Sequence, residues 1–143
     1  MKGPIRSIEV TYLVHATEDP EKVQSALTWL LGTTTPPALE RLEGHFGNDI
    51  LRARLHLTGD EAQSAFECLL SQMPQGVMHD VLSEIASHVD EHSALFLRFD
   101  KQGLVAGSLR LGSADAVRVK VKPRGFIPKG GADAFYAGLL RGA

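Results

Sequence analysis

Residues 117–122 alternate strictly between valine and a cation, and this pattern restricts how the surrounding chain can fold. Successive side chains of a β-strand point to opposite faces, so the valines share one face and the cations share the other. The cations, Arg118, Lys120 and Lys122, then stand about 6.6 Å apart. The apolar face requires a covering layer, whereas the basic face suits water or a polyanion. The segment therefore predicts a sheet that is covered on one face only.

Two interpretations of the basic face remain open at this stage. A nucleic-acid backbone carries phosphates at comparable spacing, and neutralising several of them supplies most of the non-specific affinity for nucleic acid. Alternatively, lysines keep an exposed edge strand from pairing with another chain. The alternating segment alone does not separate the two.

Hydrophobic periodicity along the rest of the chain predicts a mixture of strands and helices. Period-two alternation predicts strands at 5–15, 39–46, 50–57, 94–99 and 116–122, with a short strand or turn at 108–111. Apolar spacing of three and four residues predicts helices at 17–31, 60–72 and 77–89. This order indicates a two-layer α+β fold with an antiparallel or mixed sheet and helices packed on one face. We assign residues 1–123 to this single domain and residues 124–143 to a C-terminal tail with a short amphipathic helix.

Charge is distributed unevenly along the 143 residues. Residues 98–143 hold nine Lys/Arg against three Asp/Glu, a net charge of +6, whereas residues 1–97 carry −8. This asymmetry predicts one surface that suits a polyanion. The single cysteine, Cys68, predicts a reducing, cytoplasmic setting, and no apolar run predicts a signal peptide or a membrane span.

Other cations extend the expected basic face. Arg52 and Arg54 share the polar side of one predicted strand with His56, and Arg98 is polar in another. The alternative is that these arginines pair with carboxylates such as Glu40. Few aromatic residues are expected beside them: Phe96, Phe99, Tyr12 and Trp29 fall at predicted core positions, and Phe46, Phe126 and Tyr136 are the candidates for exposure. The scarcity favours contacts to phosphates over reading of bases.

No pattern in the sequence predicts catalysis or a metal. His88 and His92 lie four residues apart, but at the end of a predicted helix, and one cysteine excludes the usual zinc patterns. No Gly-x-Ser-x-Gly elbow or phosphate loop is present. The segment 44–48 places His45 between glycines, which is more typical of a hairpin turn than of a general base. We therefore expect no catalytic residues, cofactor or metal; an RNA-modifying enzyme would need a pocket near His45 with Glu43 or Asp100.

Three separated motifs resemble a known family. The segments HATEDPEKV (15–23), LEGHFGNDILRARL (42–55), and LFLRFDKQ with LRLGSADAVRVKVKP (95–102 and 109–123) occur in the order and spacing of the archaeal RNA-binding family regarded as predicted exosome subunits. The resemblance covers residues 5–123. It implies a fold similar to that of the large-subunit ribosomal protein L-five, and a non-enzymatic cytoplasmic protein associated with RNA processing, the exosome or the ribosome.

The resemblance also adds candidate RNA contacts at its motif positions, namely His45, Asn48, Lys101 and Gln102. Together with Arg52, Arg54, Arg98, Arg118, Lys120 and Lys122 they form the predicted RNA-binding set. The expected partner is structured or ribosomal RNA, with no membrane, and a homodimer over the sheet face stays open. The alternative function is a protein-interaction subunit. It would dock an acidic partner through the basic strip and through apolar residues of the tail, Phe135, Tyr136 and Leu139.

Overall fold

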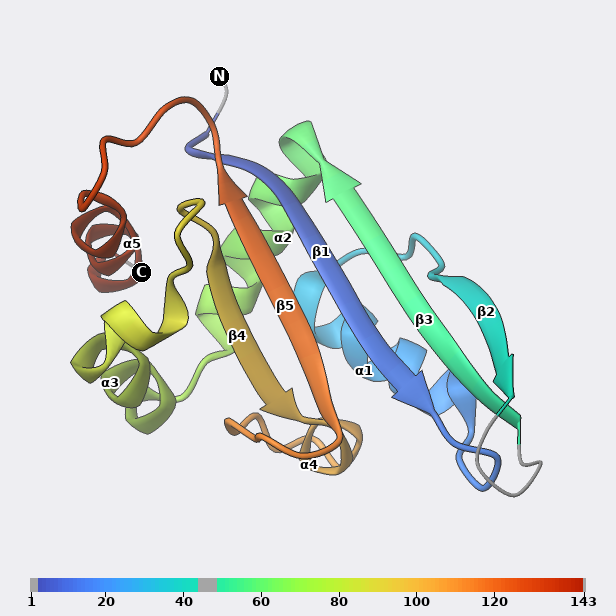
Figure 1. Ribbon diagram of the computed structural model, residues 1–143. Coiled ribbons are helices and arrows are strands. Elements are labelled where there is room, and N and C mark those ends of the chain that lie inside the picture. The colour runs from blue at the N-terminus through green and yellow to red at the C-terminus, as the bar shows by residue number, and fades with distance from the viewer. Residues whose placement is uncertain (1–2, 44–48, 143) are drawn as a thin grey trace.

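The computed structural model describes residues 3–43 and 49–142, and its centre is a five-stranded antiparallel sheet (Figure 1). The strand order is β2-β3-β1-β5-β4, and every neighbouring pair is antiparallel. The strands are β1 (Ile5–Val14), β2 (Ala38–Glu43), β3 (Asp49–Thr58), β4 (Leu95–Asp100) and β5 (Ala116–Pro123). The α+β class predicted from the sequence is confirmed, and the sheet is antiparallel throughout the described residues.

Period-two alternation decides which side chains of the sheet are buried. Every second residue of β1 from Ile8 to Val14 is buried, and the valines of β5 are fully buried beside them. β1 lies in the middle of the sheet, where β3 and β5 pair with its two sides. The opposite face of these strands carries the polar residues. The sheet therefore has one covered face and one open face, as the alternation predicts.

Two long helices cover the apolar face and lie behind the sheet in Figure 1. α1 (Pro20–Leu31) begins after Asp19, whose carboxylate accepts a hydrogen bond from the backbone N–H of Glu21, and ends at Gly32 in the left-handed conformation, with φ 68°. α2 (Gly59–Gln72) packs its apolar stripe against β1, β3 and α1. None of the helices in the described residues combines the length and the apolar character that a membrane span needs.

The helix predicted for 77–89 is instead two elements. α3 (Gln75–Ser83) is followed, after Glu84 leaves the helical conformation with φ −128°, by the 3-10 helix η2 (Ile85–His88). After the break, Val89 pairs with Leu95, the first residue of β4, and the His88 Nδ1 atom lies 3.1 Å from the Phe96 carbonyl oxygen. These contacts cover part of the outer edge of β4.

The C-terminal segment packs on the same core as the rest of the chain. α5 (Ala132–Arg141) lies beside α3 and η2 (Figure 1). Tyr136, expected to be exposed, is fully buried, and its hydroxyl donates to the carbonyl oxygens of Ser93 (2.5 Å) and Val121 (3.2 Å). Phe135 and Leu139 pack against the core as well. The apolar side of this helix is therefore used internally and is not free for a partner.

Candidate nucleic-acid interface

The open face of the sheet gathers cations from three strands. Strand register places Arg54 of β3 opposite Thr11 of β1, Thr11 opposite Arg118 of β5, and Arg118 opposite Arg98 of β4, so these four residues form one row across the sheet. Lys120 and Lys122 continue the basic side of β5 beyond this row. In Figure 1 this face is turned toward the viewer, because α1 and α2 lie behind the sheet. We call Arg54, Arg98, Arg118, Lys120 and Lys122 the basic face.

Arg98 and Arg118 are directly opposed on neighbouring strands, and both side chains are exposed. Neither forms an ion pair within residues 3–43 and 49–142. Both line a pocket of about 450 Å³, whose other wall is formed by η2 and the residues that follow it, including His88. Like charges directly opposite each other on a sheet are destabilising. The two arginines thus form a positive site without an ion-pair partner in the described residues, beside a pocket whose lining also includes Asp90.

Lys120 lies over the ring of Phe96, with its Nζ atom 5.4 Å from the ring centroid. The sequence prediction that Phe96 is a core residue is wrong, because this side chain is half-buried on the open face. The signal was present in the sequence: Leu95, Leu97 and Phe99 occupy the buried positions of β4, so the alternation places Phe96 beside Arg98. An aromatic surface therefore lies among the cations.

The two arginines of β3 differ in what they contact. Arg52 forms an ion pair with Glu40 on β2, with 2.6 Å between its Nη2 and the carboxylate, as the alternative interpretation of the sequence expected. Arg54 lies 4.0 Å from Glu9 and remains 57% exposed. Glu9 is the carboxylate that faces the row of cations from β1, and it pairs in register with Lys120. Arg52 is thus neutralised locally, whereas positive charge is concentrated over β5 and β4.

Comparison with known proteins identifies the family of the chain. A family model described as RNA binding matches residues 7–123, from β1 to the end of β5. The chain belongs to this RNA-binding family. It is 30% identical over 141 residues to the RNA-binding protein PAB1135 of Pyrococcus abyssi, with 90% of each chain covered.

Two solved structures share the fold. One is Mth689, a DUF54 protein from Methanothermobacter thermautotrophicus, with 30% identity and a TM-score of 0.77 over 96% of this chain and 99% of that chain. The other is protein AF2318 from Archaeoglobus fulgidus, with 27% identity and a TM-score of 0.81 over 94% of this chain and 99% of that chain. The archaeal RNA-binding family expected from the motifs is therefore confirmed.

Of the four candidates taken from the motifs of the RNA-binding family, the two that the structure describes, Lys101 and Gln102, do not lie on the basic face. His45 and Asn48 lie outside the described residues. Lys101, at the start of the short helix α4 (Lys101–Val105), is fully buried, so the expectation that it contacts RNA is not met by its position. Gln102 donates one side-chain N–H to Glu18 Oε2 at 2.7 Å, which uses part of its hydrogen-bonding capacity within the protein.

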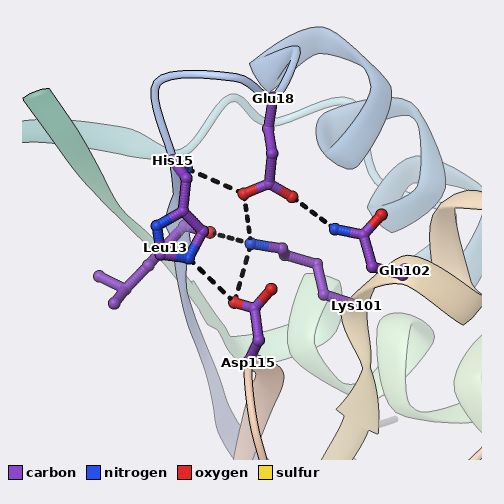
Figure 2. A network of polar contacts seen from close by, with 6 residues as sticks. All are labelled: Leu13, His15, Glu18, Lys101, Gln102 and Asp115. Atoms are coloured by element: carbon purple, nitrogen blue, oxygen red, sulfur yellow. Dashed lines mark hydrogen bonds and ion pairs between the residues drawn. The ribbon is translucent and has the colours of Figure 1, made fainter. Parts of the chain in front are cut away.

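Lys101 instead joins three distant segments at one end of the sheet (Figure 2). Its ammonium group donates to Leu13 O (2.6 Å), Glu18 Oε1 (2.7 Å) and Asp115 Oδ1 (2.9 Å), which uses all three of its N–H bonds. His15 completes the cluster: its backbone N–H donates to Glu18, and its Nε2 lies 3.5 Å from Asp115. A His and two carboxylates this close resemble a metal-ligand set, but the ammonium of Lys101 already supplies the positive charge.

This cluster was not anticipated from the sequence. A lysine directly after a strand is common at surfaces, and nothing in the order of residues indicates that Asp115 and Glu18 approach it. Asp115 itself adopts a positive φ of 32° in the turn before β5, a conformation that non-glycine residues rarely take. We infer that the cluster fixes the turns at this end of the sheet and thereby holds β1, β4 and β5 in register.

The Glu18 carboxylate makes folding sensitive to acid. Burial raises the pKa of Glu18, but hydrogen bonds from Lys101, the His15 backbone and Gln102 outweigh that effect and hold the pKa below its ordinary value. A depressed pKa in the folded state contributes stability above the unfolded pKa of about 4.3, and this contribution is lost as pH falls through the folded value.

We therefore expect Glu18→Gln to lower the free energy of unfolding by about 1–3 kcal/mol at pH 7, the usual cost of losing hydrogen bonds to a charged group. The difference from wild type should begin to shrink as pH falls below about 4.3, where the unfolded chain takes up the proton that the folded carboxylate resists, and it should vanish once pH is below the lowered pKa of folded Glu18. Urea unfolding followed by circular dichroism at pH 7 and pH 3.5 measures both values. An equal difference at the two pH values would contradict the assignment.

Proposed function

We propose that this protein is a non-enzymatic RNA-binding protein that holds the phosphate backbone of structured RNA on its basic face. The observation that carries the proposal is the directly opposed pair of Arg98 and Arg118, two exposed cations without an ion-pair partner in the described residues. Opposed like charges cost roughly 0.2–1 kcal/mol of stability. A phosphate between the two guanidinium groups reverses that cost, because each guanidinium can donate two parallel hydrogen bonds to it.

The arrangement of the remaining cations supports phosphate contacts more than base reading. Lys120 and Lys122 extend the line from Arg118 along β5, and a strand rises about 3.3 Å per residue, which spaces them like successive phosphates. Phe96 provides one aromatic ring, with the ammonium group of Lys120 above it. One ring is too few for a platform on which successive bases stack. Contacts of this kind fix RNA by backbone and shape, without reading its sequence.

We extend the proposal to RNA processing, in which the protein acts with the exosome or binds ribosomal RNA. The resemblance of the three sequence motifs to the RNA-binding family supports this extension. The competing function, docking of an acidic protein, loses the apolar area that it needs because Tyr136 is buried. A homodimer over the open face would hide the basic face. Sedimentation with and without RNA distinguishes that arrangement from a monomer that binds RNA.

Salt dependence tests the proposal directly. If RNA contacts four or five cations of the basic face, raising salt from 50 to 200 mM should lower the affinity for a labelled RNA hairpin roughly 50- to 500-fold. Fluorescence anisotropy at four salt concentrations gives the slope of the logarithm of the affinity against the logarithm of the salt concentration. Absence of binding at 50 mM salt, or affinity that is independent of salt, would overturn the proposal and direct attention to an acidic protein partner.

A further inference from the structure

A second pocket, of about 620 Å³, opens where the basic face ends at the C-terminal end of β5. Its walls are the loop that follows η2 and the connection from β5 to α5, which crosses toward α5 in Figure 1. Phe126 lines this pocket and is 89% exposed. A single exposed aromatic residue is ordinary on a protein surface. The segment that holds Phe126 and the cations that line the same pocket indicate that the ring contacts a ligand.

The segment that presents Phe126 is anchored on both sides. Before it, the Arg124 backbone N–H donates to Pro4 O (2.7 Å), and the Arg124 Nε atom donates to Gly3 O (3.0 Å). Gly125 then takes a positive φ of 83°, which redirects the chain. After it, Ile127 packs against the core. The ring of Phe126 is therefore held outward on an ordered connection.

Cations from three separate segments line the same pocket: Arg6 of β1, Lys122 of β5 and Lys129 of the connection. None of the three forms an ion pair within the part of the chain that the structure describes. The pocket thus combines an exposed aromatic ring with three cations that form no ion pair, the groups that hold an unstacked base and its phosphate.

Three carboxylates also line the pocket, and one of them, Asp90, is hydrogen-bonded within its own loop. Asp90 accepts hydrogen bonds from the backbone N–H groups of His92 (2.9 Å) and Ala94 (2.8 Å), and Glu91 lies 3.5 Å from the His92 ring. Asp133, in the first turn of α5, is the third. These carboxylates lie on the loop after η2 and on α5, whereas Arg6 and Lys122 lie on strands.

The pocket is continuous with the basic face. Lys122 belongs to both, and Val89 and Asp90 form a wall shared with the pocket that holds Arg98 and Arg118. A backbone whose phosphates follow β5 from Arg118 to Lys122 would bring its next nucleotide to Phe126. The volume lies within the range of about 300–1,000 Å³ that small-ligand sites occupy.

We propose that this pocket binds one unpaired nucleotide of the RNA, with its base stacked on Phe126 and its phosphate held by Lys122 and Lys129. This inference rests on the proposed function and specifies it: the preferred ligand is a duplex with a single-stranded extension or an unpaired nucleotide beside it. Stacking of one base contributes about 5- to 150-fold in affinity.

The test compares two labelled RNAs at constant salt, a blunt duplex and the same duplex with a three-nucleotide single-stranded extension. Phe126→Ala and Phe126→Leu are each expected to weaken binding of the extended RNA at least fivefold and to leave the affinity for the blunt duplex unchanged. Phe126→Trp should retain tight binding. Its indole fluorescence, measured with Trp29→Phe in the same chain, should be quenched by the extended RNA only. Because the ring is exposed, thermal unfolding of all variants should match wild type.

The outcomes separate the two proposals. If wild type binds both RNAs and Phe126→Ala changes neither affinity, the nucleotide site is overturned while RNA binding by the basic face stands. If Phe126→Leu binds the extended RNA like wild type, apolar contact and not stacking is responsible, which also overturns it. If wild type binds neither RNA, both proposals fail.

Discussion

Arg118→Glu is expected to lower the affinity for hairpin RNA about 100-fold while leaving the fold intact. The substitution removes one phosphate contact and places a carboxylate directly opposite Arg98. That carboxylate pairs with Arg98 and so removes a second cation from RNA. Hydrogen bonds to charged groups contribute about 1.5–3 kcal/mol each, so losing two of them corresponds to a factor of 100 or more.

Stability distinguishes this variant from a simple disruption of the sheet. An opposed pair of opposite charges replaces an opposed pair of like charges, so the free energy of unfolding should stay constant or rise by about 0.2–1 kcal/mol. Weak RNA binding with unchanged or higher stability is the expected combination. It shows that the wild-type pair is maintained for a ligand at some cost to the fold, as binding sites often are.

Lys22→Glu is the matched control, because it changes the net charge by the same amount at an exposed position on α1, behind the sheet. We expect less than a threefold loss of RNA affinity for it, since long-range charge effects are screened within about 10 Å at 0.1 M salt. Equal losses for the two variants would mean that net charge and not the basic face governs binding. Arg98→Gln should weaken binding by about tenfold and, like Arg118→Glu, should not destabilise the protein.

Much of the fold and the basic face could be predicted from the sequence because strand alternation is a local property. The valines and cations of residues 117–122 assign each side chain to a face before any partner strand is known. Alternation within a strand does not determine the register between paired strands. Only the pairing of β4 with β5 shows that Arg98 meets Arg118, and only the pairing of β2 with β3 shows that Arg52 is neutralised by Glu40.

Predictions based on residue type were less successful where long-range packing decides exposure. Trp29 was expected in the core but is 43% exposed, since it lies on the outward side of α1, whereas Tyr136 was expected at the surface and is buried. Aromatic side chains have both apolar surface and, in tyrosine and tryptophan, a polar group, so either location is stable. Phe126 was expected to be exposed and is.

The buried cluster around Lys101 could not be predicted from the sequence. Of the substitutions considered, Lys101→Met should lower the stability of the protein most. We expect the free energy of unfolding to fall by about 2–4 kcal/mol, because the substitution leaves two carboxylates facing each other without a cation, and their partial exposure to water keeps the loss below that of a fully buried pair. The Leu13 carbonyl oxygen loses its donor as well. Small domains have only about 5–15 kcal/mol of stability, so the loss would be conspicuous in urea unfolding.

Two further variants test whether the loss of stability in Lys101→Met comes from removal of the buried ammonium group. Lys122→Met removes an exposed lysine and should change stability by less than about 0.5 kcal/mol. The triple variant Lys101→Met/Glu18→Gln/Asp115→Asn removes all three charges together and should recover part of the stability, since breaking a buried ion pair costs more than replacing the whole group. If Lys101→Met is the least stable of the three variants, the carboxylates left without a cation are the cause of the loss.

RNA binding by the same variants decides between the two roles considered for Lys101. At 10 °C, where the weakened protein remains mostly folded, Lys101→Met should bind hairpin RNA within about twofold of wild type, because its ammonium group is fully buried and all of its donors are used inside the protein. Lys122→Met should show the reverse, with stability unchanged and RNA affinity reduced severalfold. A Lys101→Met variant of normal stability but weak RNA affinity would instead return this lysine to the RNA-binding set and require the turn before β5 to open when RNA binds.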